Sequence, residues 1–110
     1  MRVQGLGGGK EVSAALAPVL LEGARATALA LIFSELLQNA LEHCGGSVRI
    51  ELAERNGDVV LAIADDGGGI DGASQGTGLS IVQALVRDEL GGTLSLADVG
   101  GLRAEVVFPA

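Results

Sequence analysis

The stretch "SELLQNALEHCGG", residues 34–46, decides the fold because it describes a helix with one unusual face. Apolar residues recur at helical spacing and "CGG" provides a stop signal, so the sequence predicts a helix over residues 24–43. Four-residue steps place Glu35, Asn39 and His43 in one stripe along that helix. Either the stripe is ordinary solvated surface, or it is half of a site whose other half lies further along the chain.

Composition limits the class of protein. At 110 residues the chain is long enough for one hydrophobic core, so residues 1–110 are predicted to form a single domain. Hydrophobic residues make up 48% and aromatic residues 2%, which predicts a globular chain with an aliphatic core. A net charge of −7 argues against nucleic acid as a partner, because counterion release needs clustered Lys and Arg. A nucleotide is still allowed, since backbone N–H groups and a divalent cation can hold its few phosphates.

Cysteine usage and hydropathy predict the compartment. The single Cys44 cannot form an internal disulfide, and the first residues lack the apolar run of a signal peptide. The longest apolar run, residues 26–33, is far shorter than the ~20 residues that span a bilayer. We therefore expect a cytoplasmic domain that makes no contact with a membrane.

Strand and turn signals surround the helix. A short strand and a second one through about residues 18–22 are expected before it, and "SVRIELAER" with "DVVLAIADD" should form an antiparallel hairpin around Asn56-Gly57. A second helix is predicted over residues 79–90, followed by two strand-like runs within residues 92–109. This order predicts an α+β fold, a two-layer α/β sandwich with the helices on one face of a mixed, mostly antiparallel sheet.

Two glycine-rich junctions connect these elements. In "IADDGGGID", Asp65 ends a strand, and the glycines after it let a ligand approach the backbone. A carboxylate there can accept a hydrogen bond from an exocyclic amine such as that of adenine, although Asp and Gly are also ordinary turn residues. In "GTGLSIV", Gly76 and Gly78 precede a helix whose free N–H groups favour an anion. Alone this signal is weak, and it matches neither a Walker motif nor a dinucleotide fingerprint.

Asn39 is the least expected member of the stripe, since Asn is a poor helix former in an otherwise well-chosen helix. Exposed polar surface is the commoner explanation for any single residue of this kind. An amide oxygen is also a hard ligand suited to Mg²⁺, which binds few protein groups and keeps several waters.

Together the three segments resemble the GHKL superfamily, the ATP-binding domains of gyrase, Hsp90 chaperones, sensor histidine kinases and MutL. "ELLQNALEH" is similar to its N box, "DDGGGI" to its first glycine box and "GTGLSIV" to its second, in the same order. "GTGLSIVQALVRDELGGTLSL" and "GGLRAEVVFP" look most like the catalytic and ATP-binding domain of short-lid sensor histidine kinases. The resemblance covers the chain from about residue 18 onward and implies the Bergerat ATP-binding fold.

The resemblance implies a role for each motif. Asn39 would coordinate Mg²⁺ and act in catalysis with Glu35, which stands where the ATPase members have a general base. Asp65 would bind the adenine amino group, and His43 would lie near the phosphates. The glycine boxes would supply the remaining contacts with ATP or ADP, from Gly67, Gly69, Ile70, Gly76, Thr77, Gly78 and Leu79.

The sequence departs from the family pattern at three places. Glu42 stands where many histidine kinases carry Lys, which argues against a phosphate contact there. Only residues 71–75 separate the two glycine boxes, so the longer lid of many relatives is missing. The sole histidine is His43, inside the N box, so the chain carries no dimerisation helix with a phosphoacceptor histidine.

These features predict the ATP-binding catalytic domain of a two-component histidine kinase. It would bind Mg-ATP and present the γ-phosphate to a histidine on a dimerisation domain, which would in turn serve a response regulator. Two other interpretations stay open. One is an anti-sigma-factor serine kinase of the same fold, which the short chain favours, and the other is a nucleotide-binding module without catalysis.

Overall fold

The computed structural model describes residues 2–6, 10–43, 46–66, 77–98 and 101–110. In chain order the elements are β1 (Arg2–Leu6), β2 (Lys10–Leu16), α1 (Gly23–His43), β3 (Ser47–Arg55), β4 (Asp58–Asp65), α2 (Thr77–Asp88), β5 (Thr93–Asp98) and β6 (Leu102–Pro109). The long helix, the central hairpin, the second helix and the last hairpin all lie where the sequence predicts them, to within about two residues at each end.

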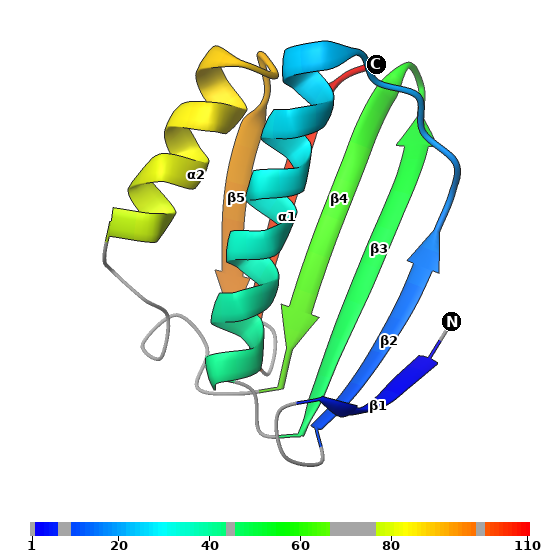
Figure 1. The fold of residues 1–110 in the computed structure, drawn as a ribbon, viewed down its shortest axis with the longest axis vertical. Coiled ribbons are helices and arrows are strands. Elements are labelled where there is room, and N and C mark those ends of the chain that lie inside the picture. Colours follow the sequence, from blue (N-terminus) through cyan, green and yellow to red (C-terminus); the bar gives the residue numbers. More distant parts are fainter. Residues whose placement is uncertain (1, 7–9, 44–45, 67–76, 99–100) are drawn as a thin grey trace.

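The described strands form one six-stranded sheet in the order β1-β2-β3-β4-β6-β5. β2 and β3 pair in parallel, whereas the other neighbours pair antiparallel. Figure 1 shows both helices on one face of this sheet, with α1 beside β4 and α2 beside β5. The α+β sandwich with a mixed, mostly antiparallel sheet is therefore confirmed.

The turn between β3 and β4 fixes the register in which these two strands pair. Asn56 and Gly57 both adopt positive φ angles, 55° and 84°, as a two-residue type I′ hairpin turn requires. From this turn the ladder runs without a bulge from the Arg55–Asp58 pair to the Val48–Asp65 pair. Asp65 therefore lies at the last rung, at the end of the sheet opposite the turn.

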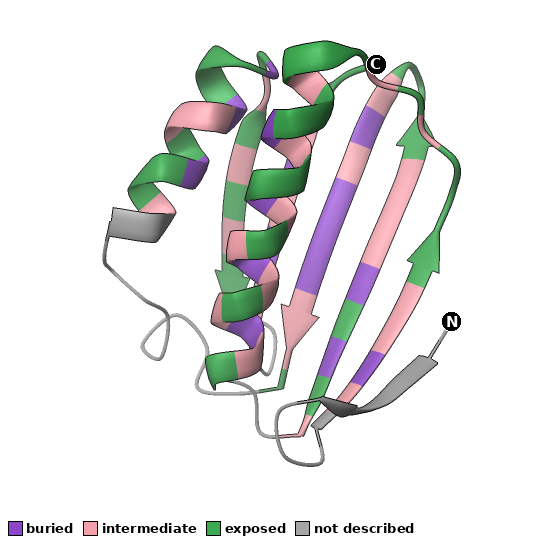
Figure 2. Cartoon of the chain, viewed as in Figure 1, coloured by how far each residue is buried: buried purple, intermediate pink, exposed green. Residues whose placement is uncertain are grey.

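The core is a layer of mostly aliphatic side chains between the sheet and one face of each helix. In α1 the buried residues repeat every four positions, so that this face packs on the sheet along its whole length: Ala28, Ile32, Leu36 and Ala40. Val82 and Val86 of α2 and Phe108 of β6 are also almost fully buried. Figure 2 shows the same division, with buried residues facing the layer between helices and sheet. Among the described residues no polar side chain is fully buried.

Two details of the predicted elements are wrong. Residues 18–22 form no strand, because β2 ends at Leu16 and Pro18 has no N–H to donate to a ladder. The second helix begins at Thr77 rather than at residue 79, so Gly78 lies inside its first turn instead of before it. Neither α1 nor α2, the helices in the described part of the chain, is both long and apolar enough to cross a bilayer.

Candidate functional site

Asn39 and Asp65 meet at one small cavity, although they come from different elements. The cavity has a volume of about 20 Å³ and lies between α1, the end of β4, the start of α2 and the last two strands. Its other lining residues are all apolar: Leu36, Ala40, Ile63, Leu79, Leu96, Leu102 and Ala104. A volume of this size holds about one water molecule, so the described residues form the floor of a site rather than a whole ligand cavity.

Position along α1 separates Asn39 from Glu35. Each of the two directly precedes a buried residue of the sheet-facing side, so both stand at a similar angle to the sheet. Asn39 lies one helical turn further along, between Leu36 and Ala40 of the cavity lining, and its side chain is half-buried. Glu35 is also half-buried, but it is not among the residues that line the cavity.

The strand β6 holds the carboxylate of Asp65 from the side opposite β3. The N–H of Leu102 donates a hydrogen bond to Oδ1 of Asp65, with a distance of 3.3 Å between N and O. Gly101, just before it, has a φ of 148° and lies so close that a Cβ would overlap the carbonyl oxygen of Asp65. Only glycine therefore allows the chain to enter β6 at this distance from Asp65.

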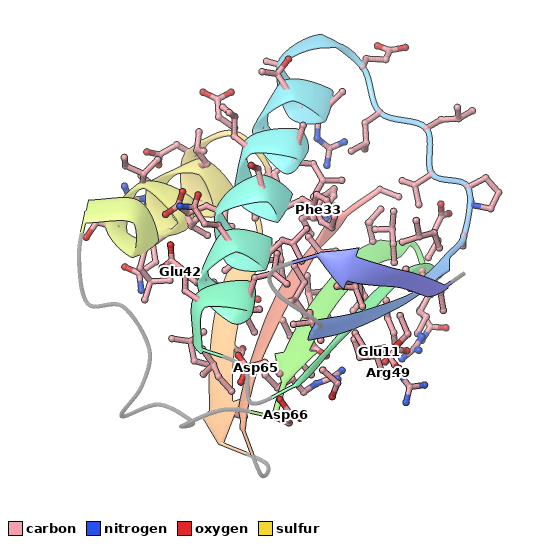
Figure 3. All side chains as sticks on the ribbon, turned by 60° about the horizontal axis from the view of Figure 1, so that its bottom comes forward. Glu11, Phe33, Glu42, Arg49, Asp65 and Asp66 are labelled. Atoms are coloured by element: carbon pink, nitrogen blue, oxygen red, sulfur yellow. The ribbon has the colours of Figure 1, made fainter. Side chains whose placement is uncertain are left out.

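Asp66 makes the most extensive set of hydrogen bonds near the site. Its Oδ1 accepts hydrogen bonds from the N–H groups of Gly46 and Ser47, at 2.9 and 3.1 Å. The hydroxyl of Ser47 donates to Oδ2 at 3.2 Å. Figure 3 shows Asp65 and Asp66 together near the end of α1, far from Phe33. The carboxylate of Asp66 thus joins the end of β4 to the start of β3.

The remaining predicted residues are placed only in part. Leu79 of α2 lines the cavity and is half-buried. Thr77 and Gly78 lie in the first turn of α2, whose N–H groups have no partner within the helix. His43 is the last residue of α1. The predicted sites at Gly67, Gly69, Ile70 and Gly76 lie outside the described residues.

Glu42 faces solvent beside the end of α1. Its Oε1 accepts a hydrogen bond of 3.2 Å from the Nε2 of Gln38, one helical turn earlier, and both residues are exposed. This contact is an ordinary i, i+4 pair on a helix surface. It supports the expectation that Glu42 is a surface residue rather than a ligand of phosphate.

Sequence reasoning missed the contributions of Asp66, Gly101 and the N–H of Leu102. The N–H of Leu102 has no signal in the sequence, because every residue except proline carries one. "VGG" before the last strand indicates a turn but not which part of the chain it approaches. For Asp66 the sequence did contain a signal. "ADD" places two consecutive carboxylates at a strand end, and because successive side chains of a strand point to opposite faces, Asp65 and Asp66 cannot both face the same site.

A second and much larger hollow lies beside the first half of α1. It has a volume of about 350 Å³ and only apolar residues line it: Leu16, Val19, Leu21, Ala26, Leu29, Ala30, Phe33, Leu52 and Leu61. We call it the apolar groove. Because no carboxylate, amide or hydroxyl lines it, it lacks the groups that orient a nucleotide.

Two neighbouring residues at the end of α2, Arg87 and Asp88, have shifted pKa values. The guanidinium of Arg87 donates from Nε to Oδ1 of Asp88 at 2.8 Å. This hydrogen bond lowers the pKa of Asp88 and raises the pKa of Arg87. Both side chains are fully exposed and lie away from the cavity, so the pair does not tune the site.

The sequence of the chain matches one family of ATPases. Residues 24–110 match the model of the family described as "Histidine kinase-, DNA gyrase B-, and HSP90-like ATPase". That match includes α1, both sides of the cavity and the last hairpin, and the chain belongs to this family. Membership implies that the chain binds ATP.

Curated relatives to which the chain is similar are sensor histidine kinases. It is 40% identical over 103 residues to the sensor histidine kinase PdtaS of Mycobacterium tuberculosis and to PdtaS of Mycolicibacterium smegmatis. Each alignment covers 81% of this chain but only 20% of the relative. The chain therefore corresponds to about a fifth of the length of these kinases.

The solved structures to which the chain is similar are also histidine kinase domains. The histidine kinase domain of the blue-light activated histidine kinase from Erythrobacter litoralis has a TM-score of 0.79 at 26% identity, covering 89% of this chain and 50% of that one. The catalytic domain of histidine kinase ThkA has a TM-score of 0.74, covering 89% of this chain and 77% of that one. At 20% identity the second likeness shows the fold alone.

Proposed function

We propose that residues 1–110 act as a single ATP-binding catalytic domain of a sensor histidine kinase. The observation that carries this proposal is the meeting of Asn39 and Asp65 at one cavity in a chain of this ATPase family. An amide from a helix and a carboxylate from a strand end give two unlike polar groups in apolar surroundings. Such a combination orients a ligand and excludes water from the rest of its contact surface.

In this proposal Asp65 accepts a hydrogen bond from the amino group of adenine. Its carboxylate is half-buried, lines the cavity and is oriented by the N–H of Leu102. Leu79 and the other apolar lining residues then contact the purine ring. The first turn of α2, with Thr77 and Gly78, receives the phosphates because its N–H groups favour an anion.

Asn39 is the proposed Mg²⁺ ligand. No group of three or more His, Cys, Asp or Glu side chains that could hold a metal occurs among the described residues. The single amide oxygen of Asn39 fits a magnesium ion that arrives with ATP, because Mg²⁺ takes one or two protein oxygens and completes its shell with phosphates and water. The ion would neutralise charge on the phosphates. Glu35 and His43, one turn to either side on α1, are proposed to face the phosphate end of the nucleotide.

The phosphoacceptor is proposed to be a histidine on a separate dimerisation domain or chain, from which a response regulator takes the phosphate. The sole histidine of these 110 residues is His43, at the end of α1 and within the proposed nucleotide site. A domain of this kind contributes orientation and charge neutralisation rather than a covalent intermediate. With one cysteine and no disulfide partner for it, a cytoplasmic location is the one we propose.

Titration with a fluorescent ATP analogue, with and without Mg²⁺, tests the binding step. We expect saturable binding that Mg²⁺ strengthens and that ATP and ADP compete away more effectively than GTP. Absence of binding at millimolar nucleotide would contradict the proposal. Competition by GTP equal to that by ATP would contradict the role of Asp65 while leaving nucleotide binding in place.

Transfer is tested by adding the cognate dimerisation domain and radiolabelled Mg-ATP. The chain alone should gain no acid-labile phosphate, and the added domain should become labelled on its histidine. Labelling should be slow because two separate chains lack the high effective concentration of a tethered pair. An acid-stable phosphate on serine of a small partner would instead favour a serine kinase of the same fold.

A further inference from the structure

Asp66 has no role in the proposed chemistry, yet it joins the end of the strand that carries Asp65 to the first described residues after the helix that carries Asn39. On one side it directly follows Asp65 in the chain. On the other side its carboxylate accepts hydrogen bonds from Gly46 and Ser47, the first described residues after α1. Asn39 lies in the last turns of α1, which ends at His43. The carboxylate therefore links the strand end that bears Asp65 to the chain that leaves the helix bearing Asn39.

The hydrogen bonds of Asp66 continue the β3–β4 ladder beyond its last backbone rung. The final paired residues are Val48 and Asp65, so Ser47 and Asp66 would form the next pair. Here the side chain of Asp66 accepts from the backbone of Gly46 and Ser47 instead. The side chain of Asp66 thereby extends the connection between the ends of the two strands by one residue.

Gly46 is held from two sides. Its carbonyl oxygen accepts a hydrogen bond of 2.7 Å from the N–H of Glu11 at the start of β2, and its N–H donates to Asp66. Gly46 is thus fixed between β2 and the end of β4. If Asp66 released Gly46 and Ser47, the start of β3 and the end of β4 would stay joined through the Val48–Asp65 pair but would lose the contacts beyond it.

We propose that Asp66 is a positioning residue for the nucleotide site, acting through Asp65 and the end of α1. This inference rests on the proposed function. Bonds to an ionised carboxylate are stronger than those between neutral groups, so the link is rigid even though Asp66 itself is exposed. Because Asp66 directly follows Asp65 in the chain, loss of Asp66 should weaken the proposed hydrogen bond between Asp65 and the amino group of adenine.

The central test compares Asp66→Ala with Asp66→Asn in the nucleotide titration. Asp66→Ala should weaken ATP binding by about three- to tenfold and reduce the preference for ATP over GTP by a similar factor, with Mg²⁺ dependence unchanged. Asp66→Asn should restore both, since an amide oxygen accepts from the two N–H groups and the amide nitrogen donates to the Ser47 hydroxyl. Glu54→Ala, which removes an exposed acid from the other end of β3, is the matched control and should change neither quantity.

A double-mutant cycle then shows whether Asp66 acts through Asp65. In an Asp65→Ala background, Asp66→Ala should cause little further loss of ATP affinity, because the group that it positions is already absent. Additive losses would overturn the inference. The inference would also be overturned if Asp66→Asn failed to recover binding and lost its response to Mg²⁺. Asp66 would then itself contact the nucleotide or its ion.

Two further outcomes separate this inference from the proposed function. If neither the parent chain nor Asp65→Ala binds ATP, both proposals fail together. If the two bind ATP equally, the role of Asp65 and the positioning inference fail, while ATP binding by the chain stands. If Asp65→Ala weakens binding but Asp66→Ala leaves affinity and the ATP preference unchanged, the positioning role alone fails. If Asp66→Ala weakens ATP and GTP equally and in proportion to a lower denaturation midpoint, Asp66 serves stability only and the inference is overturned.

Discussion

The two halves of α1 border hollows of opposite character. Its first half lines the apolar groove, about 350 Å³ in volume, with Ala26, Leu29, Ala30 and Phe33. Its second half lines a cavity of about 20 Å³ with Leu36, Asn39 and Ala40. The same helix thus lines the wide apolar groove with its first half and lines the narrow cavity, with one amide, with its second half.

The difference teaches that the chemistry of a hollow, rather than its volume, is the guide to the proposed nucleotide site. The larger hollow has no polar side chain to orient a ligand, whereas the smaller one brings an amide and a carboxylate together within apolar surroundings. The two halves should therefore respond differently to substitution. Changes beside the groove should alter the free energy of unfolding, and changes at the cavity should alter nucleotide affinity.

Phe33→Ala carries the largest expected effect, and it acts on stability. Phe33 is half-buried and packs against the core from the groove side, so its removal loses apolar contact and widens the groove. We expect the free energy of unfolding to fall by about 2 kcal/mol, measured by urea denaturation. Nucleotide affinity should stay at the parent value as long as the variant is folded.

Leu31→Ala is the control on the same helix. Leu31 is 55% exposed, so the same kind of truncation should change the free energy of unfolding by less than about 1 kcal/mol. A folded Phe33→Ala protein that no longer binds ATP would show that the groove half belongs to the nucleotide site. The contrast between the two halves of α1 would then be wrong.

Asn39→Ala should produce the opposite result at the other half of the helix. Alanine is a better helix former than asparagine by about 0.5 kcal/mol, so the denaturation midpoint should stay the same or rise slightly. Loss of the amide should weaken binding in the presence of Mg²⁺ by about tenfold. Binding without Mg²⁺ should change little, because Asp65 and the apolar lining remain.

The Mg²⁺ response of Asn39→Ala is best measured beside that of Asp65→Ala. The latter should lose discrimination between ATP and GTP while keeping its response to the ion. If both variants lose affinity equally in the presence and the absence of Mg²⁺, neither residue has a separate role. Asn39 would then act as part of the cavity wall rather than as a metal ligand.

Local sequence patterns predicted most of the fold because the controlling signals in this chain are local. The periodicity of α1, the Asn56-Gly57 turn and the alternation in the two hairpins each depend on a few neighbouring residues. The failure at residues 18–22 has the same origin, since apolar composition suggested a strand that Pro18 cannot continue. Which strands pair in parallel could be learned only from the three-dimensional structure.

The candidate site was predictable where a side chain has an unusual place in its element. Asn39 within a helix and Asp65 at a strand end both met this condition, and the structure brings them to one cavity. Glu35 shared the stripe with Asn39 but not the cavity, because it lies one helical turn, about 6 Å, before Asn39 along α1. Gly101 and the N–H of Leu102 depend on the contact between β6 and β4, which no local pattern specifies.

The smallest expected effect concerns the ion pair at the end of α2, which runs antiparallel to α1 and so ends beside its groove half (Figure 1). The pKa of Asp88 is lowered in the folded state by its hydrogen bond with Arg87. A lowered pKa means that the pair adds stability above the ordinary carboxyl range, near pH 4, and that this contribution is lost as the pH falls through the folded value. Asp88→Asn should therefore lower the thermal midpoint slightly at pH 7, with the difference from the parent vanishing once the pH lies below the lowered pKa of Asp88. Glu89→Gln, the same change of charge one residue later, is the control for the loss of one negative charge at this end of α2. Neither variant should change ATP affinity at pH 7, and a loss of affinity in Asp88→Asn would connect the groove half of the molecule to the site after all.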